Sequence, residues 1–384
     1  MRLVVISSAP IIKKENKNFL YAPYEKEMQL WAKHTNLIQF CCPVWKDDKK
    51  ILIAPISFKM DNVIELKEFD ITTFSNTLKA IPIVFTSFII IFKAMTKADH
   101  IHLRCPGNTG LIGAIVQIFF PNKPKTAKYA GNWDPNAKQP ITYKLQRWIL
   151  STTFLTKNMQ VLVYGQWLYQ TKNIKPFFTA TYSEKEILTL NENNNEILNK
   201  AKNQLNEPLH FIFVGTLSKG KQPLYAIQLI EQLIKLGKNI TIDLFGEGVM
   251  RNEIESYIQN RQLEKVVTLK GNQSKETVLK AYQKSHFLIL PSKSEGWPKV
   301  VAEAMFWGCL PLATPVSCVP YMLDNGKRGI VLKEDLEFDT NQLLEILNNE
   351  FLYKNMISEA QKWSRLYTTE TFESEIQKLI NSSI

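Results

Sequence analysis

Residues 287–308 read FLILPSKSEGWPKVVAEAMFWG, and they predict a buried strand, a loop and a helix in direct succession. Residues 287–290 are apolar throughout, as in a strand covered on both faces. Pro298 suits the first helical position, because its missing N–H would have no partner there and its φ is already helical. The amides of residues 299–301 then lie unpaired at the positive end of a helix, so the sequence predicts a phosphate-binding site.

Two carboxylates flank this predicted phosphate site. Glu295 precedes the helix, and Glu303 lies about a turn and a half inside it. Since carboxylates repel phosphate, we expect both to contact something else, and neighbouring hydroxyls of a ribose or hexose can donate two hydrogen bonds to one carboxylate. In the alternative interpretation, Glu295 only favours the helix dipole and Glu303 is solvated.

Short apolar runs alternate with helical stretches along the 384-residue chain, which is long enough for two domains. Strands separated by helices imply parallel sheets with both faces covered. The predicted strands are 3–6, 37–40, 100–103, 126–129, 161–164, 210–214, 240–245, 266–269, 287–290, 310–313 and 329–331.

We therefore predict an α/β protein with two doubly wound domains that face each other across a cleft, one over residues 1–183 and one over 208–366. The stretch 184–207 is polar and rich in asparagine, and we interpret it as the linker. Residues 367–384 include an amphipathic helix that could pack back on the N-terminal domain.

Composition and charge narrow the functional classes. Hydrophobic residues make up 45% of the chain and charged residues 22%, which excludes a disordered or collagen-like protein. The net charge of +11 comes from residues 1–180, which hold 24 basic and 11 acidic side chains, whereas residues 181–384 hold 23 and 25. Between residues 101 and 180, Asp134 is the sole acid. This one-sided charge indicates a polyanionic partner, which is nucleic acid, anionic lipid or a phosphorylated substrate.

Nucleic acid is the least expected of these partners. Only 7 of the 47 basic residues are arginine, the side chain that most often reads base edges. A nucleic-acid-binding protein remains the alternative from a different functional class.

The five cysteines show no CxxC pair and no metal-ligand spacing with the five histidines. We therefore predict reduced thiols, a cytoplasmic protein and no metal. The longest apolar run, residues 80–92, is 13 residues long and too short to cross a bilayer, which needs about 20. A buried helix is the favoured interpretation of this run, and docking on a membrane surface is the other.

Residues 291–308, in which Glu295-Gly-Trp-Pro is followed after four residues by Glu303-Ala-Met, resemble the Glu-x7-Glu signature of retaining glycosyltransferases of family 4. The resemblance covers roughly residues 208–366 and is weaker in the first half. It implies the GT-B fold and a hexosyltransferase-type enzyme that moves a sugar from a UDP- or GDP-sugar to a glycan or lipid-diphosphate-linked acceptor. It also implies retention, no metal and a place in surface polysaccharide biosynthesis.

The resemblance assigns roles to individual residues. Glu303 should hold the ribose hydroxyls, Glu295 a hydroxyl of the transferred sugar and Lys221 the diphosphate, so that Glu295 and Lys221 are the catalytic candidates. Thr216 stands where the family usually has an arginine, which leaves Lys221 as the certain cation with Lys219 nearby. The other predicted donor-binding residues are Gly215, Thr216, Lys219, Gly246, Gly271, Asn272, Gly296, Trp297, Pro298, Val300 and Val301.

The first half departs further from the family, since it lacks the usual Gly-Gly pair after the first strand and the usual histidine after a later one. Asn132, Asp134 and Arg104 follow predicted strands and are the candidates for handling the acceptor. Asp134 could instead pair with a lysine, and His102 is predicted to be a core histidine.

The basic half is free to contact an anionic membrane at the inner face of the cell membrane, because the predicted donor site lies in the other half. An epimerase on the same fold and an inactive nucleotide-sugar-binding subunit remain alternatives to the transferase.

Overall fold

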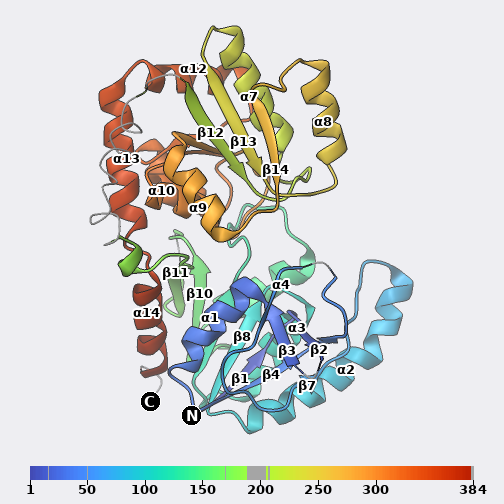
Figure 1. Ribbon diagram of the computed structural model, residues 1–384. Helices are drawn as coiled ribbons and strands as arrows, with labels where there is room; N and C mark the ends of the chain where they lie inside the picture. The colour runs from blue at the N-terminus through green and yellow to red at the C-terminus, as the bar shows by residue number, and fades with distance from the viewer. Residues whose placement is uncertain (16, 50, 169, 188–204, 206–207, 382–384) are drawn as a thin grey trace. The chain divides into compact units, whose positions relative to one another are not determined.

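The computed structural model describes residues 1–15, 17–49, 51–168, 170–187, 205 and 208–381. The chain forms two compact units, which Figure 1 shows in a colour ramp along the sequence. Unit 1 holds Met1–Phe177 and Glu373–Ile384, and unit 2 holds Phe178–Phe372. The first boundary lies close to the predicted limit at 183, and most of the predicted linker, 184–207, lies outside the described residues.

Unit 1 is built on a seven-stranded parallel sheet with the order β11-β10-β9-β8-β1-β4-β7. Its helices are α1 (Ala22–Ala32), α2 (Phe74–Thr96), α3 (Asn108–Val116), the 3₁₀ turn η1 (Gln117–Phe119) and α4 (Ile141–Ser151). Its strands are β1 (Arg2–Ile6), β4 (Leu37–Cys42), β7 (Ile64–Glu65), β8 (His100–Cys105), β9 (Lys125–Tyr129), β10 (Met159–Tyr164) and β11 (Ile174–Phe177).

A small mixed sheet with the order β5-β2-β3-β6 adds to unit 1. Its strands are β2 (Ile11–Lys14), β3 (Lys17–Tyr21), β5 (Val44–Trp45) and β6 (Ile53–Pro55). The sequence did not predict this sheet, because its strands are short and mix lysine and asparagine with apolar residues.

Unit 2 is built on a six-stranded parallel sheet with the order β14-β13-β12-β15-β16-β17. Its strands are β12 (Leu209–Val214), β13 (Ile240–Phe245), β14 (Val267–Gly271), β15 (Phe287–Leu290), β16 (Leu310–Ala313) and β17 (Ile330–Val331). Its helices are α7 (Pro223–Lys235), α8 (Arg251–Asn260), α9 (Lys275–Lys284), α10 (Lys299–Phe306), α11 (Val319–Leu323), the 3₁₀ turn η2 (Asp324–Gly326), α12 (Leu336–Leu347) and α13 (Glu350–Ser364). The last helix, α14 (Thr369–Asn381), begins in unit 2 and ends in unit 1.

The two parallel sheets confirm the prediction of a doubly wound α/β protein, and each predicted strand is present. Both sheets reverse their strand order beside their first strand, at β1/β8 in unit 1 and at β12/β15 in unit 2. In such folds, ligands bind at the carboxyl ends of the strands next to this reversal. The β12/β15 reversal is therefore the first place to look for a site in unit 2.

The prediction of a buried helix at residues 80–92 is wrong. Helix α2 has 23 residues, and only 28% of its most apolar window of 18 residues is buried. The Thr73 hydroxyl accepts a hydrogen bond from the Asn76 amide (3.2 Å) and so starts the helix before the apolar run. By length and composition alone, α2 could cross a membrane.

Candidate active site

The loops that follow β12 and β15 are bonded together at the carboxyl edge of the unit 2 sheet. The Lys293 amide donates to the Gly220 carbonyl (2.8 Å), and the Ser292 hydroxyl donates to the same oxygen (3.3 Å). The Gln222 side-chain amide donates to the Pro291 carbonyl (2.6 Å). These bonds hold the two loops together at the point where the strand order reverses.

Lys221 and Glu295, the two predicted catalytic residues, are in direct contact across these loops. The Lys221 ammonium donates to Oε1 of Glu295, and the side chains are 29% and 9% exposed. No other hydrogen bond of the Glu295 side chain is found within the described residues, so Oε2 is available to a ligand. A cation and a carboxylate thus share one small site, where the cation can hold a phosphate and the carboxylate a hydroxyl.

Glycines let the loops after β12 and β13 approach each other closely. A Cβ on Gly246, whose φ is +136°, would lie 2.0 Å from the Gly215 carbonyl oxygen. A Cβ on Gly248 would lie 2.3 Å from the Leu217 carbonyl oxygen. Only glycine fits at such distances. Backbone hydrogen bonds from Gly215 to Phe245, from Leu217 to Glu247 and from Gly246 to Gly271 (2.9, 3.0 and 2.9 Å) fix the arrangement.

The remaining predicted donor-binding residues of these loops differ in exposure. Thr216 and Lys219 are exposed beside Lys221, and Asn272 is exposed after β14. Gly271 adopts a φ of +67°. The three exposed residues follow β12 and β14, and the Lys221–Glu295 pair lies in the loops after β12 and β15 of the same sheet. Within the described part of the chain, no contact joins Thr216, Lys219 or Asn272 to the pair.

The start of α10 differs from the prediction in two respects. Pro298 is the residue before the helix, and α10 begins at Lys299. The Val301 amide donates to the Pro298 carbonyl (3.0 Å), so it is not a free donor as predicted. The Val300 amide has no hydrogen-bond acceptor among the described residues, and no side chain caps the helix. This end therefore offers fewer donors than predicted, although its positive dipole remains.

Trp297 packs into unit 2. Its ring lies 6.1 Å from Trp363, 5.5 Å from Tyr367 and 6.5 Å from Phe178, between ring centroids. The adjacent Gly296 carbonyl accepts hydrogen bonds from the Ser317 hydroxyl (2.9 Å) and the Cys318 thiol (3.2 Å). The Trp297 side chain thus anchors the loop that carries Glu295, whereas the predicted role in donor binding belongs to the backbone amides around Gly296–Pro298.

Glu303 projects from α10 into a partly buried position with its own partners. The Thr181 hydroxyl donates to Oε1 (2.8 Å) and the Tyr282 hydroxyl to Oε2 (3.4 Å). Burial raises the pKa of Glu303, and the Thr181 bond and the charge of Lys299 offset part of this rise. Glu303 is therefore not simply solvated, and the structure does not place it in contact with Glu295. No sequence pattern indicated Thr181 as its partner.

In unit 1, Arg104 belongs to a charged cluster that the sequence analysis missed. Its guanidinium lies 3.6 Å from Oε1 of Glu27 and 3.9 Å from the centre of the Tyr24 ring. Glu27 is buried and also accepts from the Lys128 ammonium (2.8 Å). Burial opposes ionisation of Glu27, but the charges of Lys128 and Arg104 outweigh it and lower its pKa to about 2. Lys128 lies in a strand that the sequence predicts to be buried, and a buried charge needs a partner. This lysine was therefore the sequence feature that could have indicated the charged cluster.

The other two predicted acceptor residues lie in the loop after β9. Asn132 accepts a hydrogen bond from the Asp134 amide (2.9 Å), and the Asp134 carboxylate accepts one from the Asn136 amide (2.8 Å). Arg147 donates to the Asp134 carbonyl (2.8 Å). Asp134 has no lysine partner in the described ranges, so the ion-pair alternative does not hold.

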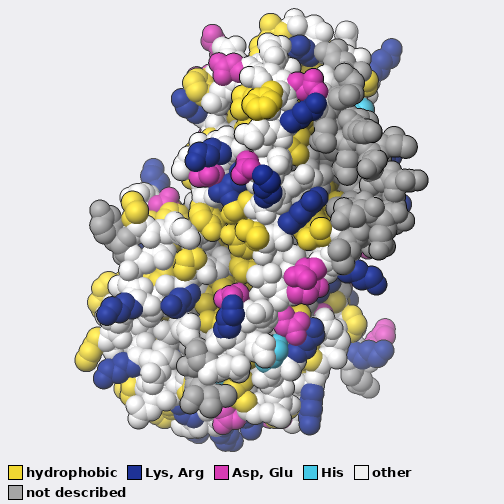
Figure 2. All heavy atoms as spheres, turned by 90° about the vertical axis from the view of Figure 1, so that its left-hand side faces the viewer, with side chains coloured by type: hydrophobic (Ala, Val, Ile, Leu, Met, Phe, Trp, Pro, Cys, Tyr) yellow, Lys and Arg dark blue, Asp and Glu magenta, His cyan; other side chains and the backbone are white. Residues whose placement is uncertain are grey.

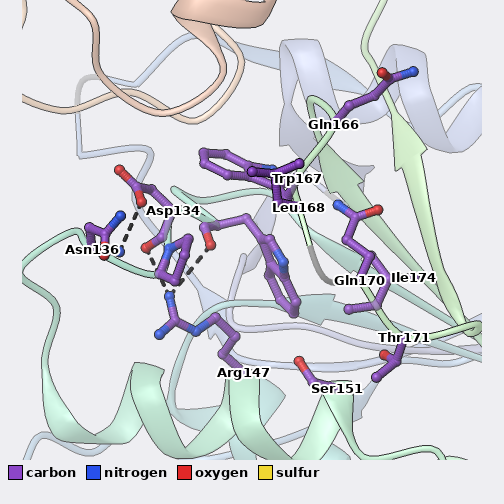
Figure 3. Close-up of a pocket in the computed structure, with 12 residues that line it drawn as sticks. Asp134, Asn136, Arg147, Ser151, Gln166, Trp167, Leu168, Gln170, Thr171 and Ile174 are labelled. Carbon is purple, nitrogen blue, oxygen red and sulfur yellow. Dashed lines mark hydrogen bonds between the residues drawn. The ribbon is translucent and has the colours of Figure 1, made fainter.

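A cavity of about 460 Å³ opens beside this loop within unit 1. Asp134 and Gln170 lie on opposite sides of it, with Trp167 between them (Figure 3). The aromatic rings can cover the apolar faces of a sugar, and the amides and the carboxylate can bind its hydroxyls. The cavity therefore suits a carbohydrate. Its lining residues are Trp133, Asp134, Pro135, Asn136, Arg147, Ser151, Gln166, Trp167, Leu168, Gln170, Thr171 and Ile174.

His102 is buried, and its Nδ1 lies 2.9 Å from the Thr126 hydroxyl, which confirms it as a core histidine. All five cysteines are free and buried. Within the described residues, no three His, Cys, Asp or Glu side chains are grouped as a metal site would need.

Comparison with known proteins adds evidence mainly for unit 2. Residues 194–363 match the family described as Glycosyl transferases group 1. An uncharacterised glycosyltransferase of Methanocaldococcus jannaschii is 25% identical over 169 residues, which are 44% of this chain and 46% of that protein. The chain spans about half the length of the curated relatives it matches.

A second relative is named by its reaction. It is the GalNAc-alpha-(1->4)-GalNAc-alpha-(1->3)-diNAcBac-PP-undecaprenol alpha-1,4-N-acetyl-D-galactosaminyltransferase of Campylobacter jejuni, 26% identical over 172 residues, or 44% of this chain and 47% of that protein.

Among solved structures, Alr3699/HepE of Anabaena in complex with UDP and glucose aligns with a TM-score of 0.63 at 13% identity, over 99% of this chain and 98% of that one. At this identity the likeness shows the fold alone, and it confirms the predicted GT-B fold.

Proposed function

We propose that this chain transfers a hexose from a nucleotide-sugar donor to a glycan or lipid-linked acceptor. Its residues 194–363 match the glycosyl transferases group 1, and its fold is GT-B. The observation that carries the proposal is the Lys221–Glu295 contact at the β12/β15 reversal. It joins the cation and the carboxylate that a sugar diphosphate requires, at the edge where doubly wound sheets bind ligands.

In the proposed site, Lys221 and the positive end of α10 hold the donor diphosphate. Glu295 accepts a hydrogen bond from a hydroxyl of the transferred sugar through the oxygen that Lys221 does not use. Glu303 accepts hydrogen bonds from the ribose hydroxyls in exchange for those of Thr181 and Tyr282. Thr216 adds no charge, so the diphosphate depends on Lys221.

The proposed reaction proceeds with retention. The bond between the anomeric carbon and the diphosphate breaks, and its electron pair leaves on the phosphate oxygen. The acceptor hydroxyl attacks the same face of the sugar, and its proton passes to the departing phosphate oxygen. Lys221 and α10 stabilise the charge that develops on the leaving group, so catalysis consists of positioning and electrostatic stabilisation. The proposal requires no metal.

The acceptor is proposed to bind in unit 1, at the cavity beside Asp134. The Campylobacter relative is named for transfer to an undecaprenyl-diphosphate-linked glycan, which supports an acceptor of this class. A place in surface polysaccharide biosynthesis is supported by a relative in Salmonella typhimurium that is named for colanic acid biosynthesis and is 28% identical over 134 residues. Because all five cysteines are free, buried thiols, we propose that the protein works in the cytoplasm.

A thermal-shift screen with UDP-, GDP- and CMP-sugars tests donor binding, since a bound donor raises the unfolding temperature by mass action. Lys221→Met should weaken binding of the best donor about 10- to 100-fold, as expected for a lost charge-assisted hydrogen bond. Lys265→Met is the matched control, because Lys265 is exposed, precedes β14 at the opposite edge of the sheet and makes no ion pair in the described structure, and it should retain wild-type affinity. If no donor shifts the wild-type protein, the proposal fails.

Transfer itself is tested by incubating the best donor with lipid-diphosphate-linked and free glycans. NMR of the anomeric proton in the product then distinguishes retention from inversion. Donor binding without any transfer would favour the inactive-subunit alternative, to which the uncharged Thr216 points. A changed sugar configuration in the nucleotide sugar would favour the epimerase.

A further inference from the structure

The outer face of α2 carries a stripe of large apolar side chains without a partner in unit 1. These side chains are between 40% and 81% exposed, and they are Phe74, Leu78, Ile81, Phe85 and Ile89. Their spacing of three or four residues places them on one side of the helix. Helix α2 lies beside α3 at the sheet of unit 1 (Figure 1). Its opposite side is buried through Ala80, Ile91 and Met95. We call the exposed stripe the α2 face.

The α2 face extends onto the 3₁₀ turn that follows α3. Phe119 is 60% exposed, and its ring centre lies 6.1 Å from both Phe88 and Phe92. The α2 face therefore forms one surface with Phe119, and such contiguous exposed apolar surfaces mark contact with a partner or a membrane.

The charged side chains of α2 itself are all positive, whereas Asp70, which precedes the helix, accepts a hydrogen bond from the Asn76 side chain (2.7 Å). Residues 71–98 contain no acid, and Lys79, Lys93 and Lys97 are exposed. Projected at 3.6 residues per turn, these three lysines lie along one flank of the stripe. None forms an ion pair within the described residues. Lys123 adds a fourth cation at the end of the helix, where it donates to the Thr96 carbonyl (2.9 Å).

The surface helices α13 and α14 have a different pattern. On the face that Figure 2 shows, where α13 and α14 run, Lys and Arg side chains alternate with Asp and Glu. On α13 the Lys354 ammonium lies 2.6 Å from Glu350, and on α14 that of Lys378 lies 2.6 Å from Glu375. The apolar stripe of α2 is longer than that of α4, which exposes Ile141, Leu145 and Trp148 beside Lys144, and neither stripe is a general consequence of the basic composition.

We propose that the α2 face docks unit 1 on the surface of an anionic bilayer. The apolar stripe enters the boundary between headgroups and acyl chains, while the three lysines keep their ammonium groups at the level of the lipid phosphates. The helix docks in the membrane plane, because its other side packs on unit 1 along its length. Charge complementarity selects this occupant, since an anionic bilayer offers both apolar depth and negative charge.

This inference deepens the proposed function, because it names the surface that brings the chain to a lipid-linked acceptor. Its evidence and its test are nevertheless independent of transferase activity. Failure of transfer would leave the docking test intact, and failure of docking would leave donor binding intact.

Flotation of the full chain with vesicles tests the proposal. The wild-type protein should float with vesicles of phosphatidylglycerol and phosphatidylcholine in equal parts, and much less with phosphatidylcholine alone. Replacing Lys79, Lys93 and Lys97 by Gln should lower partitioning about a hundredfold at low salt, from about fivefold for each lysine. The double variant Ile81→Ser, Phe85→Ser should abolish flotation on both vesicles.

The matched control is Leu236→Ser, Val249→Ser, which removes two exposed apolar side chains of unit 2 and should float like the wild type. Donor-induced thermal shifts and far-UV circular dichroism check that each variant is folded. Flotation that survives the α2 variants, or a wild-type protein that does not float with anionic vesicles, would overturn the proposal. A wild-type dimer in gel filtration that Ile81→Ser, Phe85→Ser converts to monomer would also overturn it, because the α2 face would then bind a second copy.

Discussion

Gly246→Ala should destabilise unit 2 far more than an ordinary glycine substitution at a left-handed position. The new Cβ would lie 2.0 Å from the Gly215 carbonyl oxygen and 2.8 Å from its carbon, whereas Cβ atoms essentially never approach within 3.0 Å. The loop after β12 must therefore retreat by about 1 Å. The retreat strains the bonds from Gly215 to Phe245 and from Leu217 to Glu247, which are 2.9 and 3.0 Å long.

The cost follows from these two effects. The φ of +136° costs a non-glycine residue about 1–2 kcal/mol, and each strained hydrogen bond adds about 1 kcal/mol. We expect a loss of about 3–4 kcal/mol, which lowers the unfolding temperature of a unit of this size by about 6–16 °C at about 2–4 °C per kcal/mol. Because the displaced loop contains Gly215 and Thr216, the variant should also lose most of the thermal shift that a donor produces.

Gly237→Ala is the matched control. Gly237 also has a positive φ of +80°, but no atom lies within 4 Å of the position of its Cβ. Only the backbone cost of about 1 kcal/mol should appear, with donor binding unchanged. Differential scanning calorimetry of both variants, with and without the best donor, measures the comparison. Equal losses in the two variants would refute the argument that the contact with Gly215 fixes the loop.

Three further outcomes are expected. Glu295→Gln should bind the donor within a few-fold of wild type, since Lys221 remains, while kcat falls about a hundredfold because the sugar hydroxyl loses a charged acceptor; an unchanged kcat would remove Glu295 from the site. Because burial raises the pKa of Glu303, this carboxyl keeps its proton to higher pH in the folded protein than in the unfolded chain, and the free energy of unfolding falls as the pH rises from the ordinary glutamate range through the raised pKa. Glu303→Gln should therefore unfold at a higher temperature than wild type at pH 8 and at the same temperature at pH 4. A higher unfolding temperature of the variant at pH 4 would contradict this. Glu27→Gln removes the carboxylate that pairs with the buried Lys128 and the half-buried Arg104, and it should cost about 3–5 kcal/mol in urea unfolding. The exposed Glu65→Gln should cost almost nothing.

Much of the fold is predictable from the sequence because its strands are short, continuous apolar runs. Phe287–Leu290 is buried at every position, as a short apolar run is in a parallel strand that is covered on both faces. The strands of the small sheet escape prediction, since Lys17–Tyr21 contains a lysine and an asparagine and reads as a loop.

For the candidate site, the loops were predictable but their contacts were not. Gly215 and Glu295 follow strands that are about 80 residues apart, and periodicity does not show that β12 and β15 are neighbours. The same limit hid Thr181 as the partner of Glu303 and Glu27 as the partner of Arg104. Hydropathy located the apolar run of α2, but it reports how apolar a segment is and not whether another element covers it.

The division of the chain has a consequence for its synthesis. Unit 2 is one continuous stretch, Phe178–Phe372, inserted into unit 1, and the rings of its two end residues lie 5.6 Å apart. Unit 1 receives the buried side chains of Ile376, Leu379 and Ile380 only after the whole of unit 2 has been synthesised. Unit 1 therefore cannot complete its fold before unit 2 has been made, which departs from the usual N-terminal-first order. An expression fragment that ends at residue 177 would lack part of its own core, whereas a fragment 178–372 would be complete.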